Sequence, residues 1–275
     1  MPPGYTSQQK SAISQFQNFT QADRNTAIRW LKSSGWVADQ AVNGYFSGGG
    51  GATSNTSGSE SKLRSLFDKY RDDPKNSPDI IGVDGSMKYL DAIGVNLEGL
   101  DSFAAMEIIQ APSMGEISRD GFVNGWAAVG ADSIEKQKAH INFLKKSLPS
   151  DKTKFTEIYK FSFQLGKTAQ QKAIPLENAA GFWELLFSSP MSPVQWRTPN
   201  SPWIDWWGEF LTSKWKKSVN KDMWNETLKF AQMTLDDEQI SFWNEESSWP
   251  SVIDDFVEFV KEKRGGGEEA EAMEY

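Results

Sequence analysis

The side chains that could take part in catalysis are few in this sequence. His140 is the only histidine and the chain has no cysteine, so neither a thiolate nucleophile nor a zinc site of histidine and cysteine can be built. The acidic pairs Asp236-Asp237 and Asp254-Asp255 could transfer protons, but adjacent acidic residues near helix ends are usually solvated. We therefore predict no catalytic residue, no bound metal and no cofactor.

A calcium loop is the second chemistry that the residue spacing indicates, in the segment 114–121. If an EF-hand loop begins at Gln110, Gly115 and Ile117 occupy its sixth and eighth positions. The first, third, fifth and twelfth positions, which need oxygen ligands, hold Gln110, Pro112, Met114 and Gly121. The segment 81–85 (IGVDG) could form the partner loop, but it also lacks a terminal bidentate glutamate. We predict two EF-hand-like turns that bind no calcium.

Helices should position these loops, because apolar residues recur at helical spacing from residue 62 nearly to the end of the chain. The expected helix start signals are Ser118, Asp132-x-x-Glu135, Pro175, Ser201-Pro202 and Trp249-Pro250. No alternating strand pattern of useful length is present. We therefore predict an all-α domain of about ten helices over residues 62–264, with the proline-rich stretch 188–202 as an irregular insertion.

The first part of the chain has the pattern of three short amphipathic helices, at about residues 8–17, 21–33 and 37–46. The cap pattern Thr20-x-x-Asp23 opens the second of them. The apolar residues expected to form one small core are Ile13, Phe16, Phe19, Ala27, Leu31, Trp36, Ala41, Val42, Tyr45 and Phe46. Residues 8–46 therefore resemble a ubiquitin-associated-like (UBA-like) three-helix bundle, and a bare helical spacer is the alternative.

Two segments outside these domains have compositions typical of flexible chain. Residues 47–61 (SGGGGATSNTSGSES) form a Gly/Ser tract, which we predict to be a flexible linker. Residues 265–275 (GGGEEAEAMEY) are acidic and have almost no apolar surface to bury, so we predict an acidic disordered tail.

The composition limits the classes of binding partner and the cellular compartment that we expect. The net charge of −8 would repel phosphate backbones, which argues against nucleic acid and favours basic protein surfaces as partners. The absence of cysteine fits a reducing compartment, and no apolar run is long enough to span a bilayer. We therefore expect a monomer of the cytoplasm and nucleus that has no membrane partner.

The aromatic residues and the last helix indicate surfaces for protein binding. Most tryptophans should pack in the core, and exposed aromatic anchors are expected near the terminal helix. In that helix Ile253, Phe256 and Val260 belong to an apolar stripe, which leaves Asp254 on an acidic outer face. Upstream, Asp222 lies in a first helical turn, where the helix dipole favours negative charge.

Five segments, in order along the chain, carry a resemblance to a known family. They are LRSLFDKYRDD, IGVDG, GADSIEKQKAHI, FTEIYKFSF and WPSVIDDFVEF. Together they resemble the family called defective in cullin neddylation over about residues 62–263, and the UBA-like front end fits that family as well. The resemblance implies a potentiating-neddylation (PONY or DCUN) domain over residues 62–264.

Members of that family look like scaffold-type ligases, so the resemblance implies a non-catalytic co-ligase. It would promote transfer of a ubiquitin-like modifier of the Nedd or Rub type from its conjugating enzyme to a cullin lysine, without a covalent intermediate of its own. The family's acidic cullin-binding patch maps onto Asp222, Ser248 and Asp254, with Ser248 in place of alanine. These residues would bind the winged-helix C-terminal region of a cullin.

The resemblance also implies a pocket for the acetylated N-terminal methionine of the conjugating enzyme. Its lining maps onto Val83, Ala105, Met106, Ile109, Ile117, Leu165, Phe182 and Leu185. Each of these residues could equally belong to an ordinary core. The positions that depart from residues frequent in the family are Ser86, Glu98, Ser102, Met114 and Asn178.

Two functions of other classes remain open at this point. An EF-hand-like calcium sensor would be revealed by a calcium titration, and the missing ligands argue against it. A ubiquitin-binding adaptor would use residues 1–46, but ubiquitin-binding domains of this type usually carry a Met-Gly-Phe-like motif where this chain has NFTQ at residues 18–21. Deletion of residues 1–46 would abolish the function of an adaptor and leave cullin modification by a co-ligase largely intact.

Overall fold

The computed structural model describes residues 5–47, 56–167 and 170–272. This part of the chain is almost entirely helical, with thirteen α-helices and four strands of two residues each. The chain divides into two compact units, Met1–Ser147 (unit 1) and Leu148–Tyr275 (unit 2). The predicted all-α class is confirmed. None of the described helices combines the length and the hydropathy that a membrane span requires.

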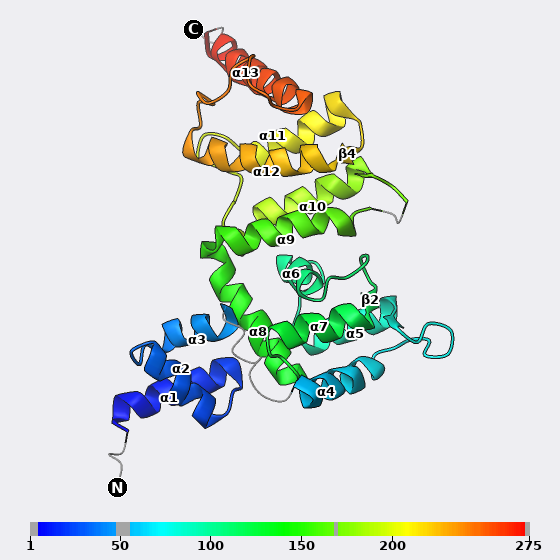
Figure 1. Cartoon of the computed structure of the whole chain (residues 1–275). Helices are drawn as coiled ribbons and strands as arrows, with labels where there is room; N and C mark the ends of the chain where they lie inside the picture. Colours follow the sequence, from blue (N-terminus) through cyan, green and yellow to red (C-terminus); the bar gives the residue numbers. More distant parts are fainter. Residues whose placement is uncertain (1–4, 48–55, 168–169, 273–275) are drawn as a thin grey trace. The chain divides into compact units, whose positions relative to one another are not determined.

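Unit 1 begins with three helices, α1 (Ser7–Thr20), α2 (Arg24–Ser33) and α3 (Ala38–Ser47), which are blue in Figure 1. Their apolar faces meet in one small core, because the buried residues recur every three or four positions. This core consists of Ala12, Ile13, Phe16, Ala22, Ala27, Leu31, Ala41, Val42, Tyr45 and Phe46, with Phe19 and Trp36 partly buried against it. The predicted UBA-like bundle is confirmed.

The start of α2 differs from the prediction. Thr20 is the last residue of α1, where its hydroxyl donates a hydrogen bond to the Phe16 carbonyl oxygen over 2.8 Å. Asp23 caps α2 instead, because its carboxylate accepts hydrogen bonds from the backbone amides of Asn25 and Thr26. A further hydrogen bond from the Thr26 hydroxyl helps to lower the pKa of Asp23.

The bundle packs against α8 (Ile134–Ser147), the last helix of unit 1. The centroid of the Phe46 ring lies 4.9 Å from that of His140 and 4.5 Å from that of Phe143. The Lys146 ammonium lies 4.3 Å from the centroid of the Phe19 ring. His140 is therefore a buried helix residue that packs against aromatic rings.

The rest of unit 1 consists of α4 (Thr56–Asp68), α5 (Val83–Ala92), α6 (Leu100–Ile108) and α7 (Arg119–Ala128). Helix α4 packs on α7, and α6 packs on both α7 and α8. The loops before α5 and α7 contain the strands β1 (Ile80–Ile81) and β2 (Ile117–Ser118), which pair antiparallel with Ile81 opposite Ile117. The two EF-hand-like turns of the prediction are therefore partners.

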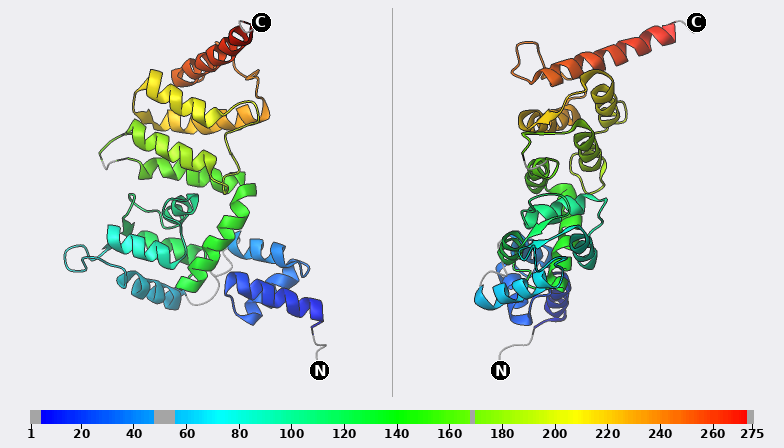
Figure 2. Two further views of the ribbon diagram at one scale, coloured as in Figure 1. Left: turned by 180° about the vertical axis from the view of Figure 1, so that it is seen from behind. Right: turned by 90° about the vertical axis from the view of Figure 1, so that its right-hand side faces the viewer.

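Unit 2 is a stack of helices in successive layers (Figures 1 and 2). The first layer holds α9 (Lys152–Leu165) and α10 (Leu176–Ser188), and the second holds α11 (Trp203–Phe210) and α12 (Lys221–Asp236). Helix α13 (Ser251–Ala272) forms the third layer and packs on both α11 and α12. A 3-10 turn (Leu148–Ser150) precedes α9, and a π turn (Leu211–Trp215) extends α11.

A second strand pair, which the sequence did not lead us to predict, lies in unit 2. Strand β3 (Ala173–Ile174) precedes α10, and β4 (Val219–Asn220) precedes α12. They pair antiparallel with Ile174 opposite Val219, and both of these side chains are buried. Unit 2 thus repeats the loop pairing of unit 1.

The core of unit 2 is built around stacked aromatic rings. The Tyr159 ring stacks on Trp224 and Trp224 stacks on Trp183, with centroids 4.8 Å and 4.9 Å apart. The Tyr159 hydroxyl donates to the Trp224 carbonyl oxygen and accepts from the Trp183 indole nitrogen, each over 2.7 Å. Half of the twelve tryptophans, Trp126, Trp183, Trp196, Trp203, Trp207 and Trp224, are fully buried, and the other six are half-buried.

The boundaries of the predicted flexible segments can be compared with the helix ends. Helix α3 ends at Ser47 and α4 begins at Thr56, so the second part of the predicted linker 47–61 is helical, and residues 48–55 lie outside the described residues. Helix α13 continues to Ala272, into the predicted tail 265–275, and residues 273–275 are not among those described. Between α10 and α11 the chain has neither helix nor strand, as predicted for the proline-rich insertion.

Candidate functional site

The first predicted cullin-binding residue, Asp222, lies in the first turn of α12. The Asn220 side chain caps this helix by accepting a hydrogen bond from the Met223 amide over 2.8 Å. The position explains an acidic residue without any partner, because the helix dipole favours negative charge there. The Asp222 side chain is nevertheless exposed, and within the described residues it has no ion pair. It is available to a basic partner.

The other two predicted residues flank the start of α13. Ser248 is exposed in the loop 237–250, and Asp254 lies half-buried in the first turn of the helix. The Asp254 carboxylate accepts a hydrogen bond from the Trp243 indole nitrogen over 2.9 Å. One oxygen of Asp254 therefore holds the loop to the helix, and the charge remains partly open to solvent.

Contacts between the loop and α12 bring the three positions onto one side of unit 2. Trp249, next to Ser248, packs on Phe230 with ring centroids 5.7 Å apart, and the Lys229 ammonium lies 4.5 Å from the Trp249 centroid. Asp222 precedes Lys229 by two helical turns, or about 10 Å along the axis, so both side chains share one face of α12. We call Asp222, Ser248 and Asp254 the acidic surface.

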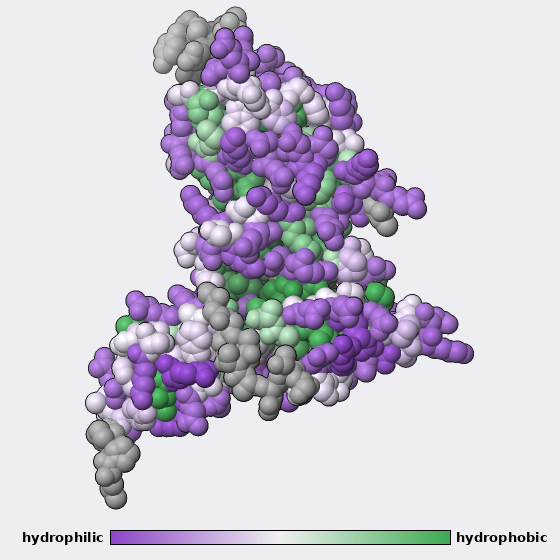
Figure 3. Space-filling model, viewed as in Figure 1, coloured by the Kyte–Doolittle hydropathy of each residue, from purple (hydrophilic) through white to green (hydrophobic). Residues whose placement is uncertain are grey.

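Charged residues accompany Asp222 along the exposed face of α12. Glu226 lies between Asp222 and Lys229 on the same helix face and pairs with Lys229 over 3.4 Å. On the face of unit 2 seen in Figure 3, hydrophilic residues form most of the surface and apolar areas are small. Such a surface suits a polar contact whose charges steer the partner.

The residues predicted to line the acetyl-methionine pocket fall into two sets. Val83, Ala105, Met106, Ile109 and Ile117 belong to unit 1, and Leu165, Phe182 and Leu185 belong to unit 2. The members buried in the core of their own unit are Ala105, Met106, Ile109, Ile117 and Leu165. Phe182 and Leu185 are half-buried on α10. Neither unit by itself therefore contains the complete predicted lining.

Val83 is the member of the unit 1 set that faces solvent, with 57% of its surface exposed. Met87, one turn later on α5, and Met114 in the β2 loop are 44% and 42% exposed. A side-chain carbon added to Gly115 would lie 3.3 Å from Val83, and the Ser86 hydroxyl donates to the Gly115 carbonyl oxygen over 3.0 Å. We call Val83, Met87 and Met114 the apolar surface.

The sequence did not lead us to predict Met87 in this surface. Met114 was noted only as a position that differs from the residues frequent in the family. The signal that could have found Met87 is its spacing, because residues four apart on a helix share one face. A partner with an apolar side chain could cover this exposed group, since large exposed apolar residues are usually binding sites when they cluster.

The described residues contain no group of three or more histidine, cysteine, aspartate or glutamate side chains placed to hold a metal ion. At the β1–β2 pair Ile81 lies opposite Ile117 with both side chains buried, and Ile80 lies opposite Ser118. The geometry of the turns is therefore maintained by apolar packing.

Comparison with known proteins identifies the family that this chain matches. The chain matches a family model described as cullin binding over residues 136–259 and one described as a UBA-like domain over residues 10–52. A relative named defective in cullin neddylation protein 1 from Pyricularia oryzae is 36% identical over 267 residues, which cover 94% of this chain and 95% of the relative.

Relatives of the same name occur in other fungi. The Yarrowia lipolytica protein is 32% identical over 197 residues, or 72% of this chain and 77% of its own length. The Saccharomyces cerevisiae protein is 24% identical over 267 residues, or 94% and 96% of the two chains. Because these similarities span most of both chains, this chain belongs to the defective in cullin neddylation protein 1 family.

Proposed function

We propose that the protein promotes transfer of a ubiquitin-like modifier from its conjugating enzyme to a cullin lysine by binding both proteins. The observation that carries this proposal is the acidic surface, where exposed Asp222 and half-buried Asp254 flank Ser248 in a region matched by the cullin-binding family model. The names of the relatives place those proteins in cullin neddylation. Lysine and arginine side chains on the winged-helix region of a cullin would complete the contact.

The conjugating enzyme would bind elsewhere, through an apolar contact. The exposed cluster of Val83, Met87 and Met114 supports a site for the acetylated N-terminal methionine of that enzyme. Burial of one methionine side chain contributes about 1.5–3 kcal/mol, and acetylation removes the terminal charge that would oppose it. Leu165, Phe182 and Leu185 of unit 2 remain part of the lining that we propose from the family resemblance.

The chemistry would then belong to the conjugating enzyme and its thioester. This chain has no cysteine to form a thioester of its own, so its contribution would be to orient a bound thioester toward the acceptor lysine. Orientation of two reactants can lower a barrier by several kcal/mol. The monomeric state and the location in cytoplasm and nucleus are further parts of the proposal.

A reconstituted cullin modification assay tests the proposal. It contains the activating enzyme, the acetylated conjugating enzyme and a cullin, and it compares the wild type with a variant carrying Asp222→Ala and Asp254→Asn. Asparagine at 254 keeps an oxygen that can accept the Trp243 hydrogen bond, so this variant should stay folded. We expect stimulation by the wild type and a loss of about tenfold or more in the variant.

The control variant carries Glu157→Gln and Glu177→Gln. It changes the net charge by the same amount on α9 and α10, away from the acidic surface. Stimulation equal to that of the wild type is expected. If the wild type gave no stimulation with any cullin, the ligase function would be refuted, and an adaptor function of residues 1–46 would become the better explanation.

A further inference from the structure

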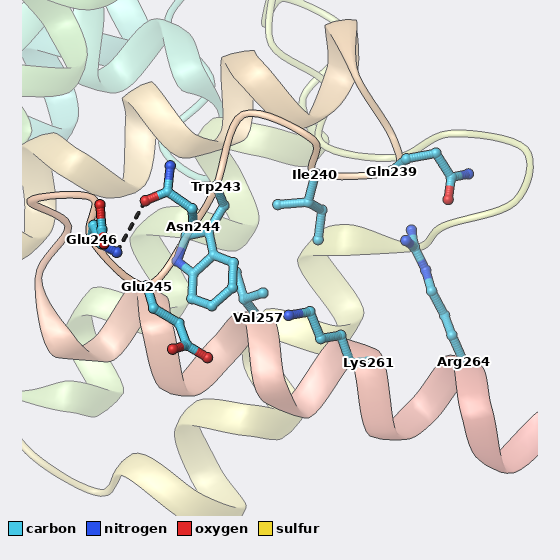
Figure 4. A pocket seen from close by; sticks show the side chains of 9 residues that line it. All are labelled: Gln239, Ile240, Trp243, Asn244, Glu245, Glu246, Val257, Lys261 and Arg264. Atoms are coloured by element: carbon cyan, nitrogen blue, oxygen red, sulfur yellow. Dashed lines mark hydrogen bonds between the residues drawn. The ribbon is translucent and has the colours of Figure 1, made fainter.

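A groove in unit 2 lies between the loop 237–250 and α13 (Figure 4). It adjoins the acidic surface, because Trp243 in its lining donates a hydrogen bond to Asp254. Its volume is about 600 Å³. Side chains of the loop and side chains of α13 face one another across it. The lining residues are Gln239, Ile240, Trp243, Asn244, Glu245, Glu246, Val257, Lys261 and Arg264.

The loop wall of the groove is fixed by local hydrogen bonds. The Asp237 carboxylate accepts hydrogen bonds from the backbone amides of Gln239 and Ser241, over 3.0 Å and 2.7 Å. Ile240 lies within this turn, between the two donor residues, and has φ +60°, a left-handed conformation that is costly for a β-branched residue. Because Ile240 is also buried, the surrounding contacts hold this strained residue in place. The groove is therefore largely formed before a partner binds.

The floor of the groove carries an aromatic ring and two cations with different roles. The Lys261 ammonium lies 4.3 Å from the Trp243 ring centroid. Arg264 donates hydrogen bonds to the Ser201 hydroxyl and the Glu238 carbonyl oxygen, each over 2.9 Å. The Arg264 guanidinium therefore stabilises the fold, and these two hydrogen bonds partly compensate its charge.

The rim of the groove is acidic. Glu245 and Glu246 are exposed, and neither forms an ion pair within the described residues. The indole of Trp243 joins this rim to the acidic surface, because its nitrogen donates to Asp254. Two exposed carboxylates without an ion pair are complementary to a lysine or arginine side chain of a partner.

We infer that this groove binds a second basic segment of the cullin, adjacent in space to the part that contacts the acidic surface. This inference rests on the proposed function. The segment places a lysine or arginine side chain beside the exposed carboxylates of Glu245 and Glu246. The groove thereby extends the contact beyond Asp222, Ser248 and Asp254 and fixes the orientation of the cullin.

The test is a titration of the full chain with the C-terminal region of a cullin, read by calorimetry at low and at physiological salt. The variant carries Glu245→Gln and Glu246→Gln, which keep the size of both exposed side chains. We expect binding about fivefold to tenfold weaker than that of the wild type, and a smaller dependence of the affinity on salt. The control with Glu157→Gln and Glu177→Gln, which has the same net charge, should bind like the wild type.

A photo-reactive residue at position 246 supplies a second measurement. Cross-linking to a cullin peptide that contains lysine or arginine supports the inference. If the glutamine variant binds like the wild type while Asp222→Ala with Asp254→Asn abolishes binding, the groove is not part of the interface and the proposed function stands. Absence of any binding by the wild type overturns both.

Discussion

The loop pair of unit 1 and the loop pair of unit 2 have the same backbone register. In each, two strands of two residues pair antiparallel, and the buried residue of one strand stands opposite that of the other: Ile81 opposite Ile117, and Ile174 opposite Val219. In both units the last residue of the second strand caps the helix that follows: Ser118 caps α7, and Asn220 caps α12. The same local solution therefore occurs twice in the chain.

The two units close their cores around these pairs in different ways. In unit 1 the backbones approach one another at glycines, since a Cβ at Gly121 or Gly125 would lie 2.1 Å from a carbonyl oxygen of residue 109 or 108. In unit 2 the space between helices is filled by the stacked rings of Tyr159, Trp183 and Trp224. Close backbone contact and large aromatic side chains are thus alternative ways to complete the same loop-paired architecture.

The largest expected effect is on unit 2, from Trp183→Ala. The substitution leaves a cavity in the aromatic stack and removes the indole donor to Tyr159, so we expect a loss of about 3–5 kcal/mol. Hydrogen exchange read by mass spectrometry should show lost protection in α9, α10 and α12. An equal loss of protection in α4 to α7 would contradict separate closure of the two cores.

The next effect is on unit 1, from Gly125→Ala. The new methyl group would meet the Ile108 carbonyl oxygen in the neighbouring helix, so α6 and α7 must move apart, at a cost of about 3 kcal/mol. Urea unfolding measures this loss. The matched control is Gly181→Ala on α10, where nothing lies within 4 Å of the added carbon. There the gain in helix propensity should stabilise the protein by about 0.5–1 kcal/mol.

This difference also explains how far the sequence could predict the fold. The loops of unit 1 carry glycines at EF-hand-like spacing, so their pairing could be predicted from the segments 81–85 and 114–121. The β3 and β4 loops have no such glycines, and the π turn Leu211–Trp215 precedes the second of them. Apolar residues such as Ile174 and Val219 look like ordinary helix-flanking residues until the strands are seen to pair.

The candidate site also contains residues that could be predicted from the sequence and residues that could not. Exposed acidic residues such as Asp222 can be recognised from helix position and family resemblance, because their surroundings matter little. For Ala105 and Met106, periodicity cannot tell a pocket lining from a core, and both are buried within unit 1. The groove beside Trp243 could not be predicted, because its wall is an irregular loop whose shape depends on local hydrogen bonds and on the strained Ile240.

Alkaline pH should affect both units, most strongly through the fully buried Tyr89 of unit 1 and Tyr159 of unit 2. Burial raises the pKa of Tyr89 and of Tyr159 well above the usual value of about 10. The unfolded chain then releases these protons first, so the stability that each neutral tyrosine contributes is complete below about pH 10 and is lost as the pH rises above it.

Single substitutions separate the contributions of the two tyrosines to stability. Tyr159→Phe leaves the Trp183 indole nitrogen and the Trp224 carbonyl oxygen without this partner, so a loss of about 1–3 kcal/mol is expected at neutral pH. Tyr89→Phe removes one hydrogen bond, to Gln137, and should cost less. In each variant the decline of stability above about pH 10, followed by circular dichroism during urea unfolding, should be shallower than in the wild type. An unchanged slope would show that the tyrosine does not control alkaline unfolding.

The smallest effects test the feature that the two loop pairs share. Ser118 and Asn220 end the second strand and cap the helix that follows, accepting hydrogen bonds from the amides of Gly121 over 3.2 Å and Met223 over 2.8 Å. Alanine at either position should cost about 1 kcal/mol, measured by urea unfolding. Asp at either position keeps an acceptor near the positive end of the helix dipole and should recover most of the loss. If alanine had no effect at Asn220 and a full effect at Ser118, strand pairing alone would set the start of α12, and the two loop pairs would share their register without sharing the cause of it.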